Sequence, residues 1–138
     1  MRLAFVTEYD GTNFSGFQKQ KNAISVQESI EDALKEVTKK NISINYAGRT
    51  DAGVHALSQV FDFETQIERD HKNCVDGINS NLPDSILVKA VTNVTDDFHS
   101  RFSALDRSYT LLFIIQKLNH YFLTRWFIGM TTLLSLMS

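Results

Sequence analysis

The stretch "ISINYAGRTDAGVHALSQVFDFET", residues 42–65, predicts two strands joined by a glycine-rich loop. Its start, "ISINYAG", is a short run of β-prone residues, and its end, "QVFDFET", alternates phenylalanine with other side chains as a half-buried strand does. The loop between them places one carboxylate, Asp51, between two glycines. Aspartate and glycine are common turn residues for conformational reasons alone, so an ordinary turn and a functional carboxylate are both open interpretations.

Outside this hairpin, the hydrophobic pattern predicts two helices and three further strands. Ser25 and Glu28 form a capping box ahead of apolar residues at helical spacing. In chain order, the expected elements are a strand at 2–9, a helix at about 26–40, a helix at about 69–80, a strand at 85–91 and a long strand from 103 to about 116. With the central hairpin, this order is the split βαβ arrangement of a ferredoxin-like α+β domain with an antiparallel sheet.

Composition favours one soluble globular domain. The chain has 138 residues, and 43% of them are hydrophobic while 22% are charged. A single cysteine, Cys74, permits no internal disulfide, so a reduced, cytoplasmic setting is expected. The formal net charge of −2 provides no overall basic field for a nucleic acid, so any phosphate contacts must come from local clusters.

The segment "WFIGMTTLLSLMS", residues 126–138, contains no charged residue. A helix needs about 20 apolar residues to cross a membrane, so we expect no membrane span here. An apolar tail of this length is expected to pack on its own domain, on a further domain or on another chain. The apolar run near the N-terminus is also too brief for a secretory signal.

Several kinds of catalytic site are not indicated by the sequence. The histidines are scattered, with no pair at the i, i+4 spacing of a helical zinc site, so no metal is expected. Neither a G-x-S-x-G stretch nor a Walker loop occurs. What remains is Asp51, with Arg49 and backbone amides close to it in sequence, a setting that suits a carboxylate acting as nucleophile or base.

Two further segments carry groups that suit RNA. "YDGTNFSGFQKQ", residues 9–20, interleaves glycines with aromatic rings and polar tips, either to bind a ligand or to cover a core edge. "DDFHSRFSALDRSYT", residues 96–110, supplies arginines that can pair phosphates and a tyrosine that can stack on a base. The arginines could instead form surface salt bridges with nearby aspartates. The candidate RNA contacts are Tyr9, Phe14, Phe17, Gln18, Lys19, His55, Arg101 and Arg107.

Three blocks, "EYDGTNFSGFQKQ", "AGRTDAGVHA" and "DDFHSRFSALDRSYT", give the chain a specific likeness, with "SVQESIEDAL" and "INSNLPDSI" between them. In order and spacing they resemble the N-terminal half of bacterial tRNA pseudouridine synthases of the TruA family, although Phe17 stands where that family often has tryptophan. The resemblance implies that uridine is isomerised to pseudouridine in the anticodon stem and loop of tRNA, by a homodimer without metal or organic cofactor. Asp51 matches the family's catalytic aspartate, Arg49 the arginine beside it, and Tyr109 the tyrosine that packs on the target base.

The resemblance also predicts how the chain is divided. It covers residues 1–125 as an N-terminal pseudouridine synthase domain and leaves residues 126–138 as an apolar tail that does not match. Members of the family add a second half that forms the other wall of the cleft, so a truncated form is expected here. Two hypotheses follow: a tRNA pseudouridine synthase that uses Asp51, or a noncatalytic RNA-binding module or inactive fragment of the same fold.

Overall fold

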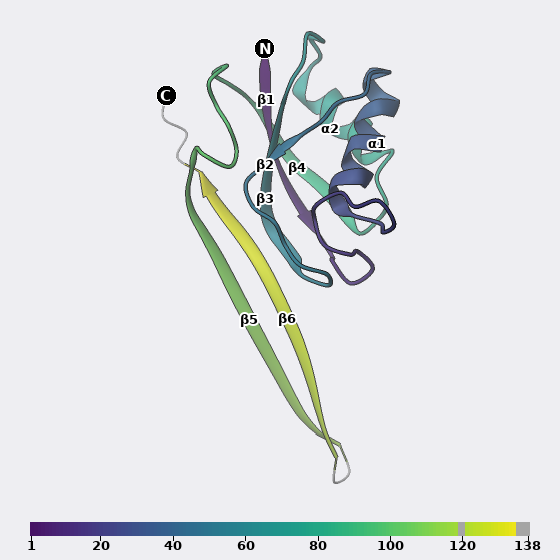
Figure 1. Cartoon of the computed structure of the whole chain (residues 1–138), viewed down its shortest axis with the longest axis vertical. Coiled ribbons are helices and arrows are strands. Elements are labelled where there is room, and N and C mark those ends of the chain that lie inside the picture. The colour runs from purple at the N-terminus through teal and green to yellow at the C-terminus, as the bar shows by residue number, and fades with distance from the viewer. Residues whose placement is uncertain (119–120, 135–138) are drawn as a thin grey trace.

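The computed structural model describes residues 1–118 and 121–134 and shows two helices on one side of a sheet (Figure 1). Both helices lie on the same face, and a long two-stranded hairpin extends away from the rest of the molecule. The elements are β1 (Arg2–Tyr9), α1 (Val26–Thr38), β2 (Asn45–Tyr46), β3 (His55–Glu64), α2 (His71–Asn79), β4 (Ile86–Val94), β5 (Ala104–Leu118) and β6 (Tyr121–Leu134).

The first four strands form the antiparallel sheet that the sequence predicts. Strand β1 lies between β4 and β3 and is antiparallel to both, and β2 pairs antiparallel with β3 on its other side. With one helix in each crossover, this arrangement confirms the split βαβ, ferredoxin-like α+β fold. Strand β2 is shorter than expected and β3 begins earlier, at His55, so the Asp51 loop joins two paired strands directly.

The core lies between the sheet and the two helices. The ring of Phe5 on β1 stacks on Phe61 and Phe63 of β3, with ring centroids 4.9 and 5.2 Å apart. Ile30 of α1 and Ile78 of α2 are fully buried in the same cluster. Each such side chain contributes roughly 1.5–3 kcal/mol to folding by its burial, so this cluster fixes β3 relative to the helices.

The first helix begins where the capping box places it. The side chain of Ser25 accepts a hydrogen bond from the N–H of Glu28 at 3.2 Å, which satisfies one of the unpaired donors of the first turn. The helix ends at Thr38, two residues before the expected end, because Lys39 adopts a left-handed conformation with φ of 57°.

The last strand, β6, was not expected from the sequence. It pairs antiparallel with β5 along its length and, through Gly129, Met130 and Thr131, pairs parallel with β3. The apolar tail is therefore joined to its own domain up to residue 134, and its remaining residues, 135–138, lie outside the described residues. The tail lacks the alternation of a half-buried strand, which is why its pattern did not predict one.

Gly77 in the interior of α2 offers a test of the helix packing. A methyl group there would meet only the Val37 side chain at 3.6 and 3.7 Å, an ordinary contact. We expect Gly77→Ala to raise the free energy of unfolding by about 0.5–1 kcal/mol, because alanine loses less backbone entropy in a helix than glycine does. Urea denaturation of both proteins measures this, and a loss of stability would mean that the two helices pack more tightly here.

Candidate active site

Two loops interlock to form the base of the site. The first connects β1 to α1 and contains residues 10–17, and the second connects β2 to β3 and contains residues 48–54. The N–H of Phe17 donates to the carbonyl of Thr50 at 3.0 Å, and the N–H of Gly53 donates to the carbonyl of Phe14 at 3.3 Å. These two bonds run in opposite directions, so they hold the loops together on both sides of Asp51.

Glycine is required at two points where these loops approach each other. A Cβ at Gly16 would lie 2.7 Å from the carbonyl oxygen of Thr50, and its φ of +90° is itself a conformation that other residues avoid. A Cβ at Gly11 would lie 1.9 Å from the carbonyl oxygen of Val54. The glycines of the first loop therefore permit close contact with the backbone of the second.

A tight turn carries Asp51. The N–H of Val54 donates to the carbonyl of Asp51 at 3.1 Å, and Gly53 has a φ of +79°, as the third residue of a type II turn requires. Thr50 is buried on one side of Asp51, whereas Arg49, Asp51 and Ala52 are exposed. The turn thus directs the carboxylate away from the core.

The aromatic residues of the first loop lie beneath this turn. Phe17 is completely buried, Tyr9 and Phe14 are nearly so, and the Phe17 ring contacts Tyr9 and Tyr46 with centroids 5.9 and 4.7 Å away. Of the two interpretations left open for this loop, covering a core edge describes these three rings. Gln18 and Lys19 are exposed, and the ammonium of Lys19 pairs with Glu31 at 3.3 Å.

The phenol of Tyr9 links the core to the Asp51 loop. Its oxygen lies 2.7 Å from the hydroxyl oxygen of Thr50, the residue that precedes Asp51. Burial raises the pKa of Tyr9 above its ordinary value; hydrogen bonds from Thr50 and Gln59 oppose the shift, and the nearby Tyr109 adds to it. Tyr9 is therefore neutral at physiological pH and can donate to Thr50.

Tyr109 reaches the same region through the sheet. In β5 it pairs with Met130 of β6, which in turn pairs with Ala56 of β3. Adjacent strands are about 4.8 Å apart, so Tyr109 lies on the order of 10 Å from the start of β3, where the Asp51 loop ends. Its side chain is 58% exposed. The structure therefore brings Tyr109 to the same end of the sheet as the Asp51 loop.

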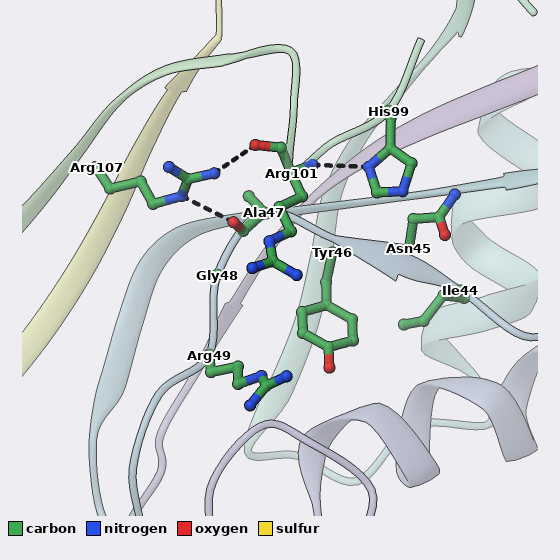
Figure 2. Close-up of a pocket in the computed structure, with 9 residues that line it drawn as sticks. All are labelled: Ile44, Asn45, Tyr46, Ala47, Gly48, Arg49, His99, Arg101 and Arg107. Atoms are coloured by element: carbon green, nitrogen blue, oxygen red, sulfur yellow. Dashed lines mark hydrogen bonds between the residues drawn. The ribbon is translucent and has the colours of Figure 1, made fainter. Parts of the chain in front are cut away.

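A pocket of about 620 Å³ adjoins the loop, lined by main chain and side chains of two segments. Three of the lining residues are arginines: Arg49 from the Asp51 loop, Arg101 from the turn before β5, and Arg107 from β5 itself (Figure 2). The remaining lining residues are Ile44, Asn45, Tyr46, Ala47, Gly48 and His99. Arginine donors from separate segments thus face one cavity, although Asp51 itself does not line it.

Hydrogen bonds fix the side of the pocket that is formed by His99, Arg101 and Arg107. Arg107 donates from Nε to the carbonyl of Ala47 at 2.8 Å and from Nη2 to the carbonyl of Arg101, and the N–H of Arg101 donates to Nδ1 of His99 (Figure 2). In the described part of the chain, no ion pair joins either arginine to Asp96, Asp97 or Asp106. The salt-bridge alternative therefore does not describe these arginines.

His55, at the start of β3, contacts the first loop. The N–H of Gly11 lies 3.0 Å from Nδ1 of His55, and a carboxylate oxygen of Asp10 lies 3.1 Å from the same nitrogen. A backbone N–H donates only to an unprotonated nitrogen, so the first contact requires Nδ1 to be an acceptor, and we take it as the bond that holds the ring. Hydrogen bonds from the hydroxyl and the N–H of Thr12 lower the pKa of Asp10.

Other kinds of site are absent from the described residues. No group of three or more metal-binding side chains occurs among residues 1–118 and 121–134. Within the same ranges, no helix has the length and apolar character needed to cross a membrane.

The fold and the site together define an α+β domain that presents a carboxylate on a tight turn beside an arginine-lined pocket. The model of a protein family described as tRNA pseudouridine synthase matches residues 5–103, which include both loops and most of the pocket. The chain therefore belongs to the tRNA pseudouridine synthase family.

Individual relatives agree with this assignment. The chain is 49% identical over 109 residues to tRNA pseudouridine synthase A of Nitrosomonas eutropha, an alignment that covers 79% of this chain and 39% of the relative. It is 50% identical over 109 residues to the protein of that name from Pseudoalteromonas atlantica, covering 79% and 41% of the two chains. With that of Pasteurella multocida, identity is 47% over 118 residues, covering 86% and 45%. The chain thus spans less than half the length of these relatives.

A pair of glycine variants tests the interlock. Gly16 and Gly53 both have positive φ, but a Cβ at Gly53 would meet no atom within 4 Å. We expect Gly53→Ala to lower the free energy of unfolding by about 1–2 kcal/mol through the backbone alone. Gly16→Ala should cost about 1–3 kcal/mol more, because its Cβ would press on the carbonyl of Thr50. Urea denaturation compares them, and equal losses would contradict the close approach of the loops.

Alkaline stability tests the buried phenol of Tyr9. Because its pKa in the folded chain is raised above the unfolded value near 10, the neutral phenol stabilises the fold fully below that pH, and this contribution is lost as the pH rises through the folded value. We expect Tyr9→Phe to make the free energy of unfolding fall less steeply above about pH 10 than it does in the wild type. Denaturant titrations across this range measure the slope, with Tyr46→Phe as the control for removing a phenol from the same cluster. Identical slopes for wild type and Tyr9→Phe would contradict the shift.

Proposed function

We propose that this chain isomerises uridine to pseudouridine in the anticodon stem and loop of tRNA, with Asp51 as the nucleophile. The observation that carries the proposal is the exposed Asp51 carboxylate on a turn that two interlocked loops hold rigid. The names of the relatives, all tRNA pseudouridine synthase A, support the same reaction and the same class of substrate.

The reaction needs a nucleotide that has left its stack, because a carboxylate cannot reach the reacting atoms of a stacked base. Asp51 attacks the flipped nucleotide at the sugar or at the base ring, and the bond between C1′ and N1 breaks. The uracil turns and a bond forms between C5 and C1′, while the bond to Asp51 breaks and restores its carboxylate. N1 gains a proton, and the proton on C5 is then removed. We propose that Tyr109 packs on the target base and takes this proton, because it is largely exposed at the same end of the sheet as Asp51.

The arginine pocket suits the phosphates that flank the target. With a formal net charge of −2, the chain has no overall attraction for RNA, so local cations must supply the contacts. Arg49, Arg101 and Arg107 line one cavity, and guanidinium groups pair well with phosphate oxygens. We propose that exposed Gln18 and Lys19 also contact RNA. Buried Tyr9, Phe14 and Phe17 support the catalytic loop from below, and His55 holds the first loop at Gly11.

Partners and setting follow from the same proposal. The alignments cover 39% and 45% of two of these relatives, and the family resemblance implies that the second half of such proteins forms the other wall of the cleft. We propose that the chain acts as a homodimer in the cytoplasm, as the family resemblance implies, with residues 1–125 as the pseudouridine synthase domain and the tail from residue 126 as an addition to it.

Replacement of Asp51 tests the chemistry. Incubating the chain with unmodified tRNA and mapping pseudouridine chemically should detect the product in the wild type. We expect Asp51→Asn to reduce its formation by about a thousandfold or more, because the nucleophile is lost. The affinity for tRNA should change by no more than about twofold, since the carboxylate contacts no phosphate.

The matched control is Asp76→Asn, which removes an exposed carboxylate from α2 and from none of the residues that line the arginine pocket. It should keep both product formation and affinity. If the folded wild-type chain formed no pseudouridine while a full-length relative did, activity of this chain would be excluded. Retained affinity for tRNA would then favour the noncatalytic RNA-binding module.

A further inference from the structure

A buried carboxylate that the proposed chemistry does not use lies on β3. Asp62 has no exposed surface, and burying a carboxyl group is costly unless donors surround it. Its two oxygens accept four hydrogen bonds from three side chains and one backbone amide. The donors are Arg2 Nη1 at 2.5 Å and Asn45 Nδ2 at 3.1 Å, both to Oδ2, and Ser100 N–H at 2.7 Å and Ser100 Oγ at 2.6 Å, both to Oδ1.

The four donor groups belong to three residues from separate parts of the chain. Arg2 begins β1, Asn45 lies in β2, and Ser100 lies in the turn that leads into β5. Ser100 is itself completely buried, and both of its donor groups go to Asp62. Asp62 is therefore the anchor of this turn, which is separated from β3 by α2 and β4 in sequence.

The anchored residues are next to the arginine pocket. Asn45 lines one wall of the pocket, and His99 and Arg101, the two neighbours of Ser100, line the other. The segment from Ser100 to Arg101 spans a single peptide bond, so any shift of Ser100 moves the backbone of Arg101 with it. The carbonyl of Arg101 also accepts from Arg107, which extends the effect to the second arginine of the pocket.

Only a side chain with two acceptor atoms, such as a carboxylate, can accept all four of these hydrogen bonds. Every group that faces Asp62 is an N–H or O–H donor. An asparagine amide has one acceptor oxygen and an NH₂ group, so one side of it would turn hydrogens toward Ser100, or toward Arg2 and Asn45. The shape would be kept, but the NH₂ group would meet the Ser100 N–H or the Arg2 guanidinium, so at least one of the four hydrogen bonds would be replaced by a contact between donors.

We infer that Asp62 is a positioning residue that holds the turn at Ser100 and thereby sets the place of Arg101 in the pocket. The part of this inference that concerns RNA rests on the proposed function. The part that concerns the turn does not, because it can be measured on the free chain.

Amide hydrogen exchange of the full chain tests the turn. We expect Asp62→Asn to increase the exchange rate of the Ser100 amide by about tenfold to a hundredfold, because this amide would lose an acceptor that carries a charge. Ser100→Ala removes only the hydroxyl and should give a smaller increase at the amide of Arg101. The control is Val88→Ala, which opens the buried core at β4 and should leave the turn unchanged. Unchanged exchange at Ser100 in Asp62→Asn would overturn the inference.

The same exchange data distinguish a variant that destabilises the whole fold from one that loosens only the turn at Ser100. If Asp62→Asn raised exchange equally throughout the sheet, the variant would have destabilised the whole fold, and the outcome for Ser100→Ala would decide. The milder Ser100→Ala then provides a second decision, since a faster exchange confined to residues near 99–101 supports the anchor and an even change over the whole chain opposes it.

A double-mutant cycle tests the connection to RNA. The affinities of wild type, Asp62→Asn, Arg101→Gln and the double variant are measured with an anticodon stem-loop oligonucleotide by fluorescence anisotropy. If Asp62 acts through Arg101, the double variant should bind no more than about twofold more weakly than Arg101→Gln alone. Multiplied losses would show that Asp62 affects binding by another route. A wild-type chain that binds no RNA would refute the proposed function, while the exchange data would still decide the role of Asp62.

Discussion

The position of Asp51 depends on two hydrogen bonds made by the preceding residue, Thr50. Its carbonyl accepts from the N–H of Phe17, its hydroxyl meets the phenol of Tyr9, and Gly16 lets the two loops approach closely enough for the first of these bonds. Phe17 and Tyr9 are buried in the core, so the backbone just before Asp51 is fixed by the packing of the sheet and helices. The backbone of the Asp51 loop is therefore held in place although its charged side chains are exposed, and such a loop can position a side chain for binding or reaction.

Strand β3 supports both halves of the site. Its first residues follow the Asp51 turn and pair with β6, and through β6 they place Tyr109 of β5. Near the other end of β3, the buried carboxylate of Asp62 accepts hydrogen bonds from Arg2, Asn45 and Ser100. The arginine pocket is lined by residues 44–49, which lead into the Asp51 turn, and by His99 and Arg101, which flank Ser100. Because β3 also stacks Phe61 and Phe63 on β1, the core and the site share one structural element.

Sequence patterns predicted the parts that depend on neighbouring residues. The cap at Ser25, the helices and the turn at Asp51 follow from periodicity and turn chemistry over a few positions, and the structure contains them. The burial of Phe14 and Phe17 was not predictable in this way, since aromatic rings among glycines suit a binding loop equally well. Asp62 was missed because a charge on a strand normally faces water, and its donor Ser100 is 38 residues away in the chain. Strand β6 forms by pairing with β3 and β5, and the sequence of β6 alone does not predict this pairing.

The chain holds two aspartates, close together in sequence, in opposite states. Asp62 is buried and has donors on both oxygens, so its lone pairs are occupied and it can serve only to hold structure. Among the described residues, no side chain or amide donates to the carboxylate of Asp51, which is exposed to water instead. Solvation weakens a nucleophile, and a bound nucleotide that displaces this water would remove that restraint. Under the proposed function, the arginine pocket would therefore do more than attract RNA: binding of the flanking phosphates there would supply the energy that desolvates Asp51 at the reacting base.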